Sequence, residues 1–203
     1  MSVSTNENAG SGASGTIGGF TGVAWTSPGN ITASDDSYAS VDLTLTNTTS
    51  QALQATNFGF GIPPHATIDG ILCTFERKAS AESVIRDNHV YLIYSNNLLG
   101  DNKVSAPAYW LTTEGDVTFG SPSDQWGATL TPSIVNDSSF GVLIDAQYYS
   151  AYAGTETAYV DRIYITVYYT VDFLCGWGSG SISKIYYGST QVSKVYYGTT
   201  RVA

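Results

Sequence analysis

The two histidines and several turn carboxylates are the residues of this chain that could carry acid–base or metal chemistry. His65 follows two prolines and His89 opens an alternating run, and neither has a cysteine or glutamate at the spacing of a zinc site. A Ser–His–Asp triad needs no fixed spacing, yet the chain contains no G-x-S-x-G turn to present a nucleophilic serine. We therefore predict that the protein is not an enzyme and holds no cofactor.

Aspartates in turn-like segments offer the oxygen ligands that Ca²⁺ prefers. Asp35 and Asp36 lie in SDDSY, Asp87 lies in RDN, and Asp101 lies in GDN. Their spacing matches no calcium loop, and aspartates in turns commonly hydrogen-bond their own backbone. We predict no metal site.

Aromatic residues are the third group with binding chemistry, because their rings present apolar faces to a sugar. The chain has four tryptophans and fifteen tyrosines. Trp110 and Trp126 are the candidates for glycan stacking. The alternative is that large aromatic residues fill the core and the subunit interfaces, where tyrosine and tryptophan are enriched. We favour the core interpretation and keep glycan binding as the second one.

The C-terminus repeats a decapeptide, SKIYYGSTQV at 183–192 and SKVYYGTTRV at 193–202. Each copy predicts a short strand, a Gly-Ser or Gly-Thr turn suited to a type II′ hairpin, and a return strand. An isolated hairpin is marginal in water, so this tail needs a surface to lie on. The alternative, that this tail pairs with the edge of a sheet in the main domain of its own chain, stays open. The predicted assembly contact consists of Ile185, Tyr186, Tyr187, Val195, Tyr196 and Tyr197.

Composition excludes several partners. The formal net charge is −9 and only 12% of residues are charged, so we predict no nucleic-acid partner, because phosphate would be repelled. No apolar run approaches the ~20 residues of a membrane span, and the first residues do not resemble a secretory signal. We therefore predict no membrane partner. Cys73 and Cys175 are read as free thiols of a protein made in a reducing cytosol.

Apolar and polar residues alternate with a period of two through the middle of the chain, which predicts strands there. The clearest runs are 71–76, 90–95, 140–146 and 158–170. Turn residues separate them, as in SPGN, IPPH, LGDN and GSPSD. Many short strands without alternating helices predict an all-β fold, an antiparallel β-sandwich of jelly-roll-like type.

The longest run, AYVDRIYITVYYT, makes a specific prediction about faces. Strict alternation places Asp161 and Arg162 on opposite faces. A buried Asp161 would need a partner, such as Arg77 or Arg86. The predicted shared face comprises Tyr159, Asp161, Ile163, Ile165 and Val167.

Three segments differ in composition. Residues 1–19 are rich in serine and glycine with little to bury, which predicts a flexible arm; a partner chain is the simplest agent that would order it. Residues 20–172 carry the strand pattern of the β-sandwich. Residues 173–203 are a glycine-rich linker followed by the tandem hairpin tail.

Several strings in the middle of the chain form a recognisable set. They are SDDSYASVDL, LQATNFGFGIPPHATIDGI, SDQWGATLTP, SFGVLIDA and AYVDRIYITVYYT, and together they span about residues 25–169. This set resembles a module of bacteriophage virion structural proteins. The C-terminal decapeptide is similar to short tandem tails of such proteins.

The resemblance implies a non-enzymatic virion protein, most simply a capsid decoration or head-fibre protein that binds the capsid lattice. The alternative that it implies is a tail-fibre or receptor- and glycan-binding module. It also implies a homotrimer whose partners are its own copies and capsid or other virion proteins. The expected location is the virion, after synthesis in the host cytoplasm.

Overall fold

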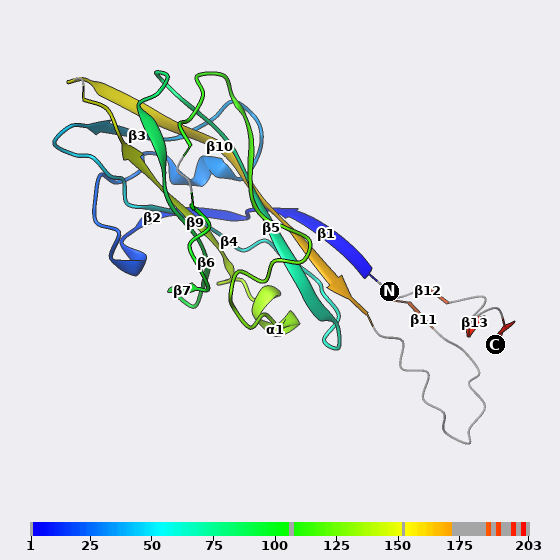
Figure 1. The fold of residues 1–203 in the computed structure, drawn as a ribbon. Helices are drawn as coiled ribbons and strands as arrows, with labels where there is room; N and C mark the ends of the chain where they lie inside the picture. The colour runs from blue at the N-terminus through cyan, green and yellow to red at the C-terminus, as the bar shows by residue number, and fades with distance from the viewer. Residues whose placement is uncertain are drawn as a thin grey trace. The chain divides into compact units, whose positions relative to one another are not determined.

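The computed structural model describes residues 2–105, 108–151 and 153–171, together with the backbone of four short strands nearer the C-terminus (Figure 1). The chain divides into two compact units, Met1–Asp172 and Phe173–Ala203. The first unit contains all of the long strands.

Two five-stranded sheets build the first unit, and every pairing within them is antiparallel. The strands of the first sheet are β1 (Ser2–Asn8), β3 (Ala39–Thr44), β5 (Thr67–Ala79), β8 (Gly115–Gly120) and β10 (Thr155–Thr170). Their order is β1-β10-β5-β8, and β3 also pairs with β10. The strands of the second sheet are β2 (Ser11–Gly15), β4 (Ala52–Thr56), β6 (Ile85–Tyr94), β7 (Asn97–Leu99) and β9 (Gly141–Tyr148). Their order is β2-β4-β9-β6-β7. The predicted all-β antiparallel sandwich is confirmed.

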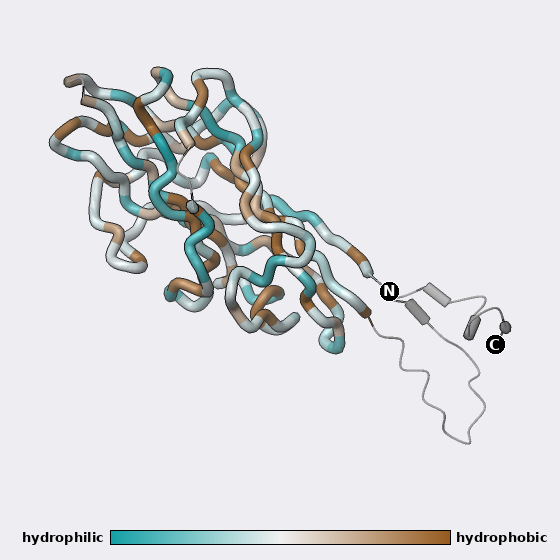
Figure 2. The backbone as a smooth tube through the Cα atoms, in the orientation of Figure 1, coloured by the Kyte–Doolittle hydropathy of each residue, from teal (hydrophilic) through white to brown (hydrophobic). Residues whose placement is uncertain are grey.

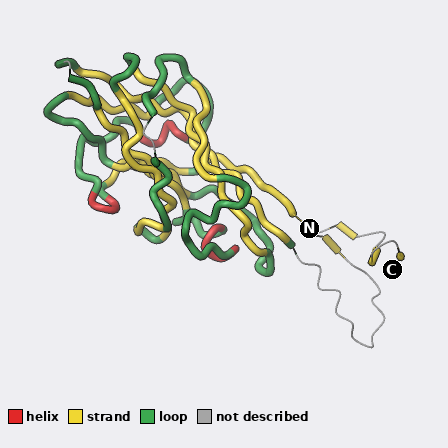
Figure 3. The backbone as a smooth tube through the Cα atoms, in the orientation of Figure 1, coloured by secondary structure: helices red, strands yellow, loops and turns green. Residues whose placement is uncertain are grey.

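Helical segments are short in the part of the chain that the structure describes (Figure 3). They are the 3₁₀ segments η1 (Ile17–Gly19) and η2 (Pro28–Ile31) and the α-helix α1 (Pro132–Val135). None of the described helices has the length and apolar character needed to cross a bilayer.

The core lies between the two sheets and follows the alternation of the strands. In Figure 2 hydrophobic positions alternate with paler and hydrophilic ones along the strands. Phe75, Phe140 and Ile144 are fully buried, and so is Cys73, where burial raises the pKa of the thiol well above its ordinary value. Cys175 lies outside the described residues.

A β-bulge in β10 changes the predicted faces of the longest strand. The pairing of β10 with β5 shifts register between Val160 and Arg162, which leaves Asp161 as the extra residue. Val160 therefore joins Ile163 and the following alternate residues in the core, although strict alternation placed it on the other face. The bulge is invisible to a period of two, because it arises from pairing with another strand.

The N-terminal segment corrects the expectation of a flexible arm. β1 pairs with residues 164–170 of β10, and β2 pairs with all of β4. Ala9, between the two strands, is buried where the chain crosses from one sheet to the other. The segment is therefore ordered by strands of its own chain, and the expectation that a partner chain orders it is wrong.

Two glycines explain why the composition of residues 1–19 wrongly predicted a flexible arm. A Cβ atom at Gly10 would collide with the Asn57 carbonyl oxygen, and one at Gly12 would collide with the Pro28 carbonyl oxygen. Glycine allows this close approach of backbones, whereas composition alone reads it as flexibility. Main-chain pairing also needs no apolar side chain, so the small and polar character of the segment does not prevent strands.

The long strand β10 defines two ends of the sandwich. At one end Ser2 pairs with Thr170, so both termini of the first unit leave the sandwich there; we call this the exit end. At the other end Thr155 pairs with Thr44, and turns between strands gather; we call this the loop end. A strand of 16 residues spans about 50 Å at ~3.3 Å per residue, which separates the two ends widely.

The second unit contains two hairpins, one in each copy of the decapeptide, as the sequence predicts. The first joins β11 (Tyr186–Tyr187) to β12 (Thr190–Gln191), and the second joins β13 (Tyr196–Tyr197) to β14 (Thr200–Arg201). In both, two residues separate the paired strands in the sequence.

Candidate functional site

The two tryptophans that were candidates for glycan stacking lie in the core. Trp110 is 2% exposed and Trp126 is 0% exposed. The Trp126 Nε1–H donates to the Ile71 carbonyl oxygen at 3.0 Å, and the Trp110 Nε1–H donates to Asp87 Oδ1 at 3.0 Å. Neither ring has a face open to a sugar, so the stacking interpretation at these residues is wrong and the core interpretation is right.

Trp110 belongs to a buried charged group that fills the interior near the loop end. Arg77 Nη2 lies 2.9 Å from Asp87 Oδ2, both side chains are 3% exposed, and Arg77 Cζ lies 4.3 Å from the Trp110 ring centroid. Burial raises the pKa of Asp87 to about 6, against the opposing charge of Arg77. Burial likewise lowers the pKa of Arg77 to about 10. Solvent does not reach the group, which is consistent with a structural role.

Asp161 has different partners from the arginines expected for it. Its carboxylate accepts hydrogen bonds from the backbone N–H groups of Asp35, at 3.4 Å, and Asp36, at 3.3 Å. Asp36, Glu114 and Asp161 also place carboxylate oxygens within 4.8 Å of one another. Lys78 Nζ lies 3.4 Å from Glu114 Oε2, so a cation of the protein already neutralises part of this cluster.

The turn aspartates considered as calcium ligands are not all brought together. Asp35 and Asp36 lie beside Asp161, whereas the Asp101 carboxylate lies against Gly127 in another loop. Asp35 Oδ1 accepts from the Ser37 backbone N–H at 3.0 Å, the self-capping expected of an aspartate in a turn. The absence of a metal site stays a prediction.

The two histidines lie in unrelated places. His65 is exposed in the loop before β5. His89 Nδ1 lies 2.9 Å from Asp145 Oδ1, and its ring packs at 4.7 Å from the Phe20 ring centroid. Burial raises the pKa of Asp145. The histidine with its carboxylate therefore ties the segment after η1 to the outer face of the second sheet, and the lack of enzymatic activity stays a prediction.

Exposed apolar side chains gather at the loop end. Among the residues with described side chains, the exposed large hydrophobic ones are Leu45 (44%), Tyr109 (42%), Leu111 (69%) and Tyr149 (51%). Leu45 follows β3, Tyr149 follows β9, and Tyr109 and Leu111 precede β8. The turns of both sheets thus bring together residues that are far apart in the sequence.

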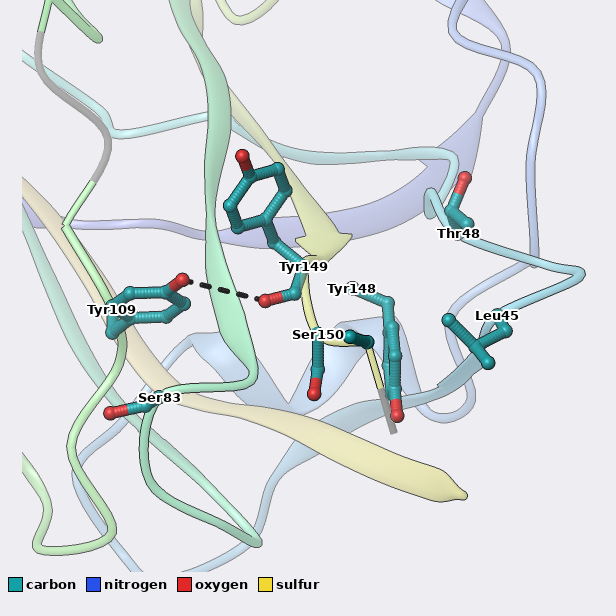
Figure 4. Close-up of a pocket in the computed structure, with 8 residues that line it drawn as sticks. Leu45, Thr48, Ser83, Tyr109, Tyr148, Tyr149 and Ser150 are labelled. Atoms are coloured by element: carbon teal, nitrogen blue, oxygen red, sulfur yellow. Dashed lines mark hydrogen bonds between the residues drawn. The ribbon is translucent and has the colours of Figure 1, made fainter. Parts of the chain in front are cut away.

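A pocket of about 550 Å³ lies among these turns (Figure 4). Its lining includes the exposed tyrosines Tyr109 and Tyr149, and also Tyr148, which is buried at 4% exposure. The ring centroids of Tyr109 and Tyr149 are 6.4 Å apart with an interplanar angle of 41°, and the Tyr109 hydroxyl donates a long hydrogen bond of 3.5 Å to the Tyr149 carbonyl. Thr48, Ser83 and Ser150 add hydroxyl groups to the lining.

Sequence reasoning missed this pocket. The usable signal was the Tyr148–Tyr149 pair directly after a predicted strand, in a segment of small residues where two large rings have little to pack against. Nothing in the sequence indicated that Tyr109 lies beside that pair, because the two segments are brought together by the pairing of Arg86 with both Tyr109 and Gln147.

The predicted assembly residues lie in the second unit. Tyr186 and Tyr187 form β11, and Tyr196 and Tyr197 form β13. Ile185 and Val195 lie outside the described residues. Their contact with another protein therefore stays a prediction.

Comparison with known proteins gives little. No protein-family model matches the sequence, and no curated protein matches it. A solved structure titled "Cyanophage Pam1 capsid asymmetric unit" is similar to this chain at 16% sequence identity with a TM-score of 0.28. That match covers 66% of this chain and 82% of the other chain. A similarity at this level assigns the chain to no family.

Proposed function

We propose that this chain is a non-enzymatic structural protein of a bacteriophage virion, a capsid decoration or head-fibre protein that binds the capsid lattice through its C-terminal unit. The resemblance of five strings over residues 25–169 to a module of phage virion proteins supports this proposal. All five strings lie in the sandwich.

The observation that carries the proposal is the common exit of both termini. Because Ser2 pairs with Thr170, the chain enters and leaves the sandwich at one end. The loop end lies about 50 Å from this exit end along β10, so the two ends of the sandwich can carry separate contacts. This polarity suits a protein that is fixed to a lattice and presents a domain.

The tandem hairpins supply the attachment in this proposal. Two-residue strands with a two-residue turn bury too little to be stable alone, so a partner surface is needed to hold them. Pairing of a hairpin edge with a strand of another protein would provide that surface through main-chain hydrogen bonds. The contact would use the apolar positions 185–187 and 195–197 of the two copies.

A homotrimer completes the proposal. Three copies would present six hairpins from one attachment point, and linked weak contacts gain affinity through effective concentration. Trimerisation rests on the resemblance alone, and sedimentation of the full chain tests it.

A second candidate, a tail-fibre or receptor-binding module, is favoured by the exposed tyrosines at the loop end. The copy number of the protein on purified virions distinguishes the two: a number that scales with the capsid subunits indicates decoration, and a small fixed number indicates a tail component.

The test of attachment compares the full chain with a chain that ends at Asp172 and with a full-length Tyr187→Ala/Tyr197→Ala variant. We expect both altered proteins to keep the melting transition of the sandwich and to lose co-sedimentation with purified virions. A matched control is Gln191→Arg, which gives the first copy the residue that the second has. Normal co-sedimentation of the chain that ends at Asp172 would refute attachment through the C-terminal unit.

A further inference from the structure

We propose that the loop-end pocket binds a neutral saccharide. The pocket is lined by the three tyrosines 109, 148 and 149, by three hydroxyl side chains and by two small apolar surfaces from Leu45 and Ala151. This inference does not rest on the proposed function, because it concerns the end of the sandwich opposite to the termini.

The exposed rings are the first reason. Tyr149 is 51% exposed and Tyr109 is 42% exposed, although an aromatic ring gains free energy when it is buried. Their planes meet at 41°, so they form two walls of an open angle rather than a closed stack. The C–H faces of a sugar ring pack well against such walls.

The second reason is that the Tyr149 ring is held in place before any ligand arrives. Arg86 Cζ lies 3.4 Å from the Tyr149 ring centroid, and Arg86 Nε donates to Gln147 Oε1 at 2.9 Å. The Tyr149 backbone N–H donates to the Val84 carbonyl oxygen at 2.7 Å. A ring fixed from behind costs little conformational entropy when a ligand packs on it, which favours binding.

The third reason is the polar chemistry of the lining. Thr48 and Ser83 contribute hydroxyl groups, which act as both donors and acceptors and so complement the hydroxyls of a sugar. No residue lining the pocket carries a formal charge. The nearby guanidinium of Arg86 is occupied by Gln147 and Tyr149.

Charge selects the class of saccharide. The net charge of −9 repels sialylated, sulfated or phosphorylated glycans, and the lining provides no cation to compensate. A neutral sugar is not repelled by this charge and needs no cation in the lining. The volume of about 550 Å³ falls in the ~300–1,000 Å³ range of ligand pockets, which is room for a short oligosaccharide.

The experiment uses the full chain and neutral oligosaccharides ending in glucose, galactose, mannose or N-acetylglucosamine. Binding is detected on a printed array and measured by saturation-transfer NMR. We expect at least one probe to bind with a Kd between about 0.1 and 10 mM. Tyr149→Ala should weaken that binding at least about tenfold, Tyr149→Phe should retain most of it, and Tyr109→Ala should weaken it as well.

The matched control is Leu111→Ala. Leu111 is also exposed at the loop end and lies two residues from Tyr109, but it does not line the pocket, so binding should not change. Circular dichroism of each variant confirms the fold. The proposal is overturned if no neutral probe binds at about 10 mM, if Tyr149→Ala and Tyr109→Ala bind as well as the unaltered chain, or if only anionic glycans or proteins bind.

Discussion

The exit end and the loop end of the sandwich are stabilised in different ways. At the exit end, β1 has no buried side chain and is fixed by main-chain pairing along seven residues of β10. At the loop end, large apolar side chains stay exposed, although the buried Arg77–Asp87–Trp110 group lies just beneath. At the exit end, polar residues form a regular strand, whereas at the loop end large apolar side chains are exposed to solvent.

This difference teaches that exposure, and not hydrophobicity, marks the surface available for recognition. The polar N-terminal residues look free in the sequence but are committed to sheet pairing. Tyr149, in contrast, is half exposed although it carries a large aromatic ring.

The largest effects are expected from the buried tryptophans, one toward each end. Trp126→Ala removes a fully buried ring beside Ile71 toward the exit end, and Trp110→Ala removes the ring against Arg77 toward the loop end. Each should lower the free energy of unfolding by about 3–5 kcal/mol. Urea unfolding measures this. A loss below about 1 kcal/mol for either variant would mean that the ring is not buried as described.

Deletion of residues 2–15 should have the next largest effect. It exposes the edge of β10 over residues 164–170 and the edge of β4, so we expect the melting temperature to fall by about 5 °C or more and aggregation to increase. Differential scanning calorimetry and light scattering measure the two effects. The control deletes residues 173–203 and should leave the melting transition of the sandwich in place. An unchanged melting temperature without residues 2–15 would restore the flexible-arm interpretation.

The free energy of unfolding should also depend on pH, because Asp87, near the loop end, has a raised pKa. Its pKa in the folded protein is about 6, above the ordinary 3.8, so the folded state binds more protons than the unfolded state between these values. The free energy of unfolding should therefore fall as the pH rises from about 4 to about 6 and then level off. Asp145 and Asp161, whose pKa values burial also raises, contribute with the same sign.

Urea unfolding at a series of pH values measures this slope. Asp87→Asn removes the contribution of Asp87 and should reduce the slope, which leaves the contributions of Asp145 and Asp161. A free energy that instead rises with pH across this window in the unaltered chain would contradict the assigned direction.

The smallest effects on stability are expected from exposed side chains at the loop end. Leu111→Ala should change the free energy of unfolding by less than about 0.5 kcal/mol, because Leu111 is 69% exposed. Tyr149→Ala should change it by less than about 1 kcal/mol, because the half-exposed ring loses its contact with Arg86. The same urea assay measures it. A loss above about 2 kcal/mol from Tyr149→Ala would show that this ring belongs to the core and would remove the basis for a binding wall.

Local patterns were sufficient for the strands and the hairpins. Alternation in 71–76, 90–95 and 140–146 predicted parts of β5, β6 and β9, because one face of each strand packs against the core. The two-residue turns of the decapeptide predicted their hairpins, since a turn is encoded by adjacent residues.

Features that depend on pairing between distant segments were not predictable. The bulge at Asp161 arises from the register of β10 against β5. The partner of Arg77 is Asp87, which β6 of the opposite sheet brings within 2.9 Å. The loop-end pocket combines the turns after β3 and β9 with the loop before β8, and no local signal links them.

The sequence by itself determined the fold class, the existence of most strands and the repeated hairpins, because these follow from the period of side-chain alternation and from turn residues a few positions apart. Only the tertiary structure decided that Gly10 and Gly12 allow two close backbone contacts, that Trp110 and Trp126 are core, and that Tyr109 and Tyr149 are exposed together. The physical reason is that exposure is a property of what covers a residue. In an antiparallel sandwich the covering strands come from segments far away along the chain.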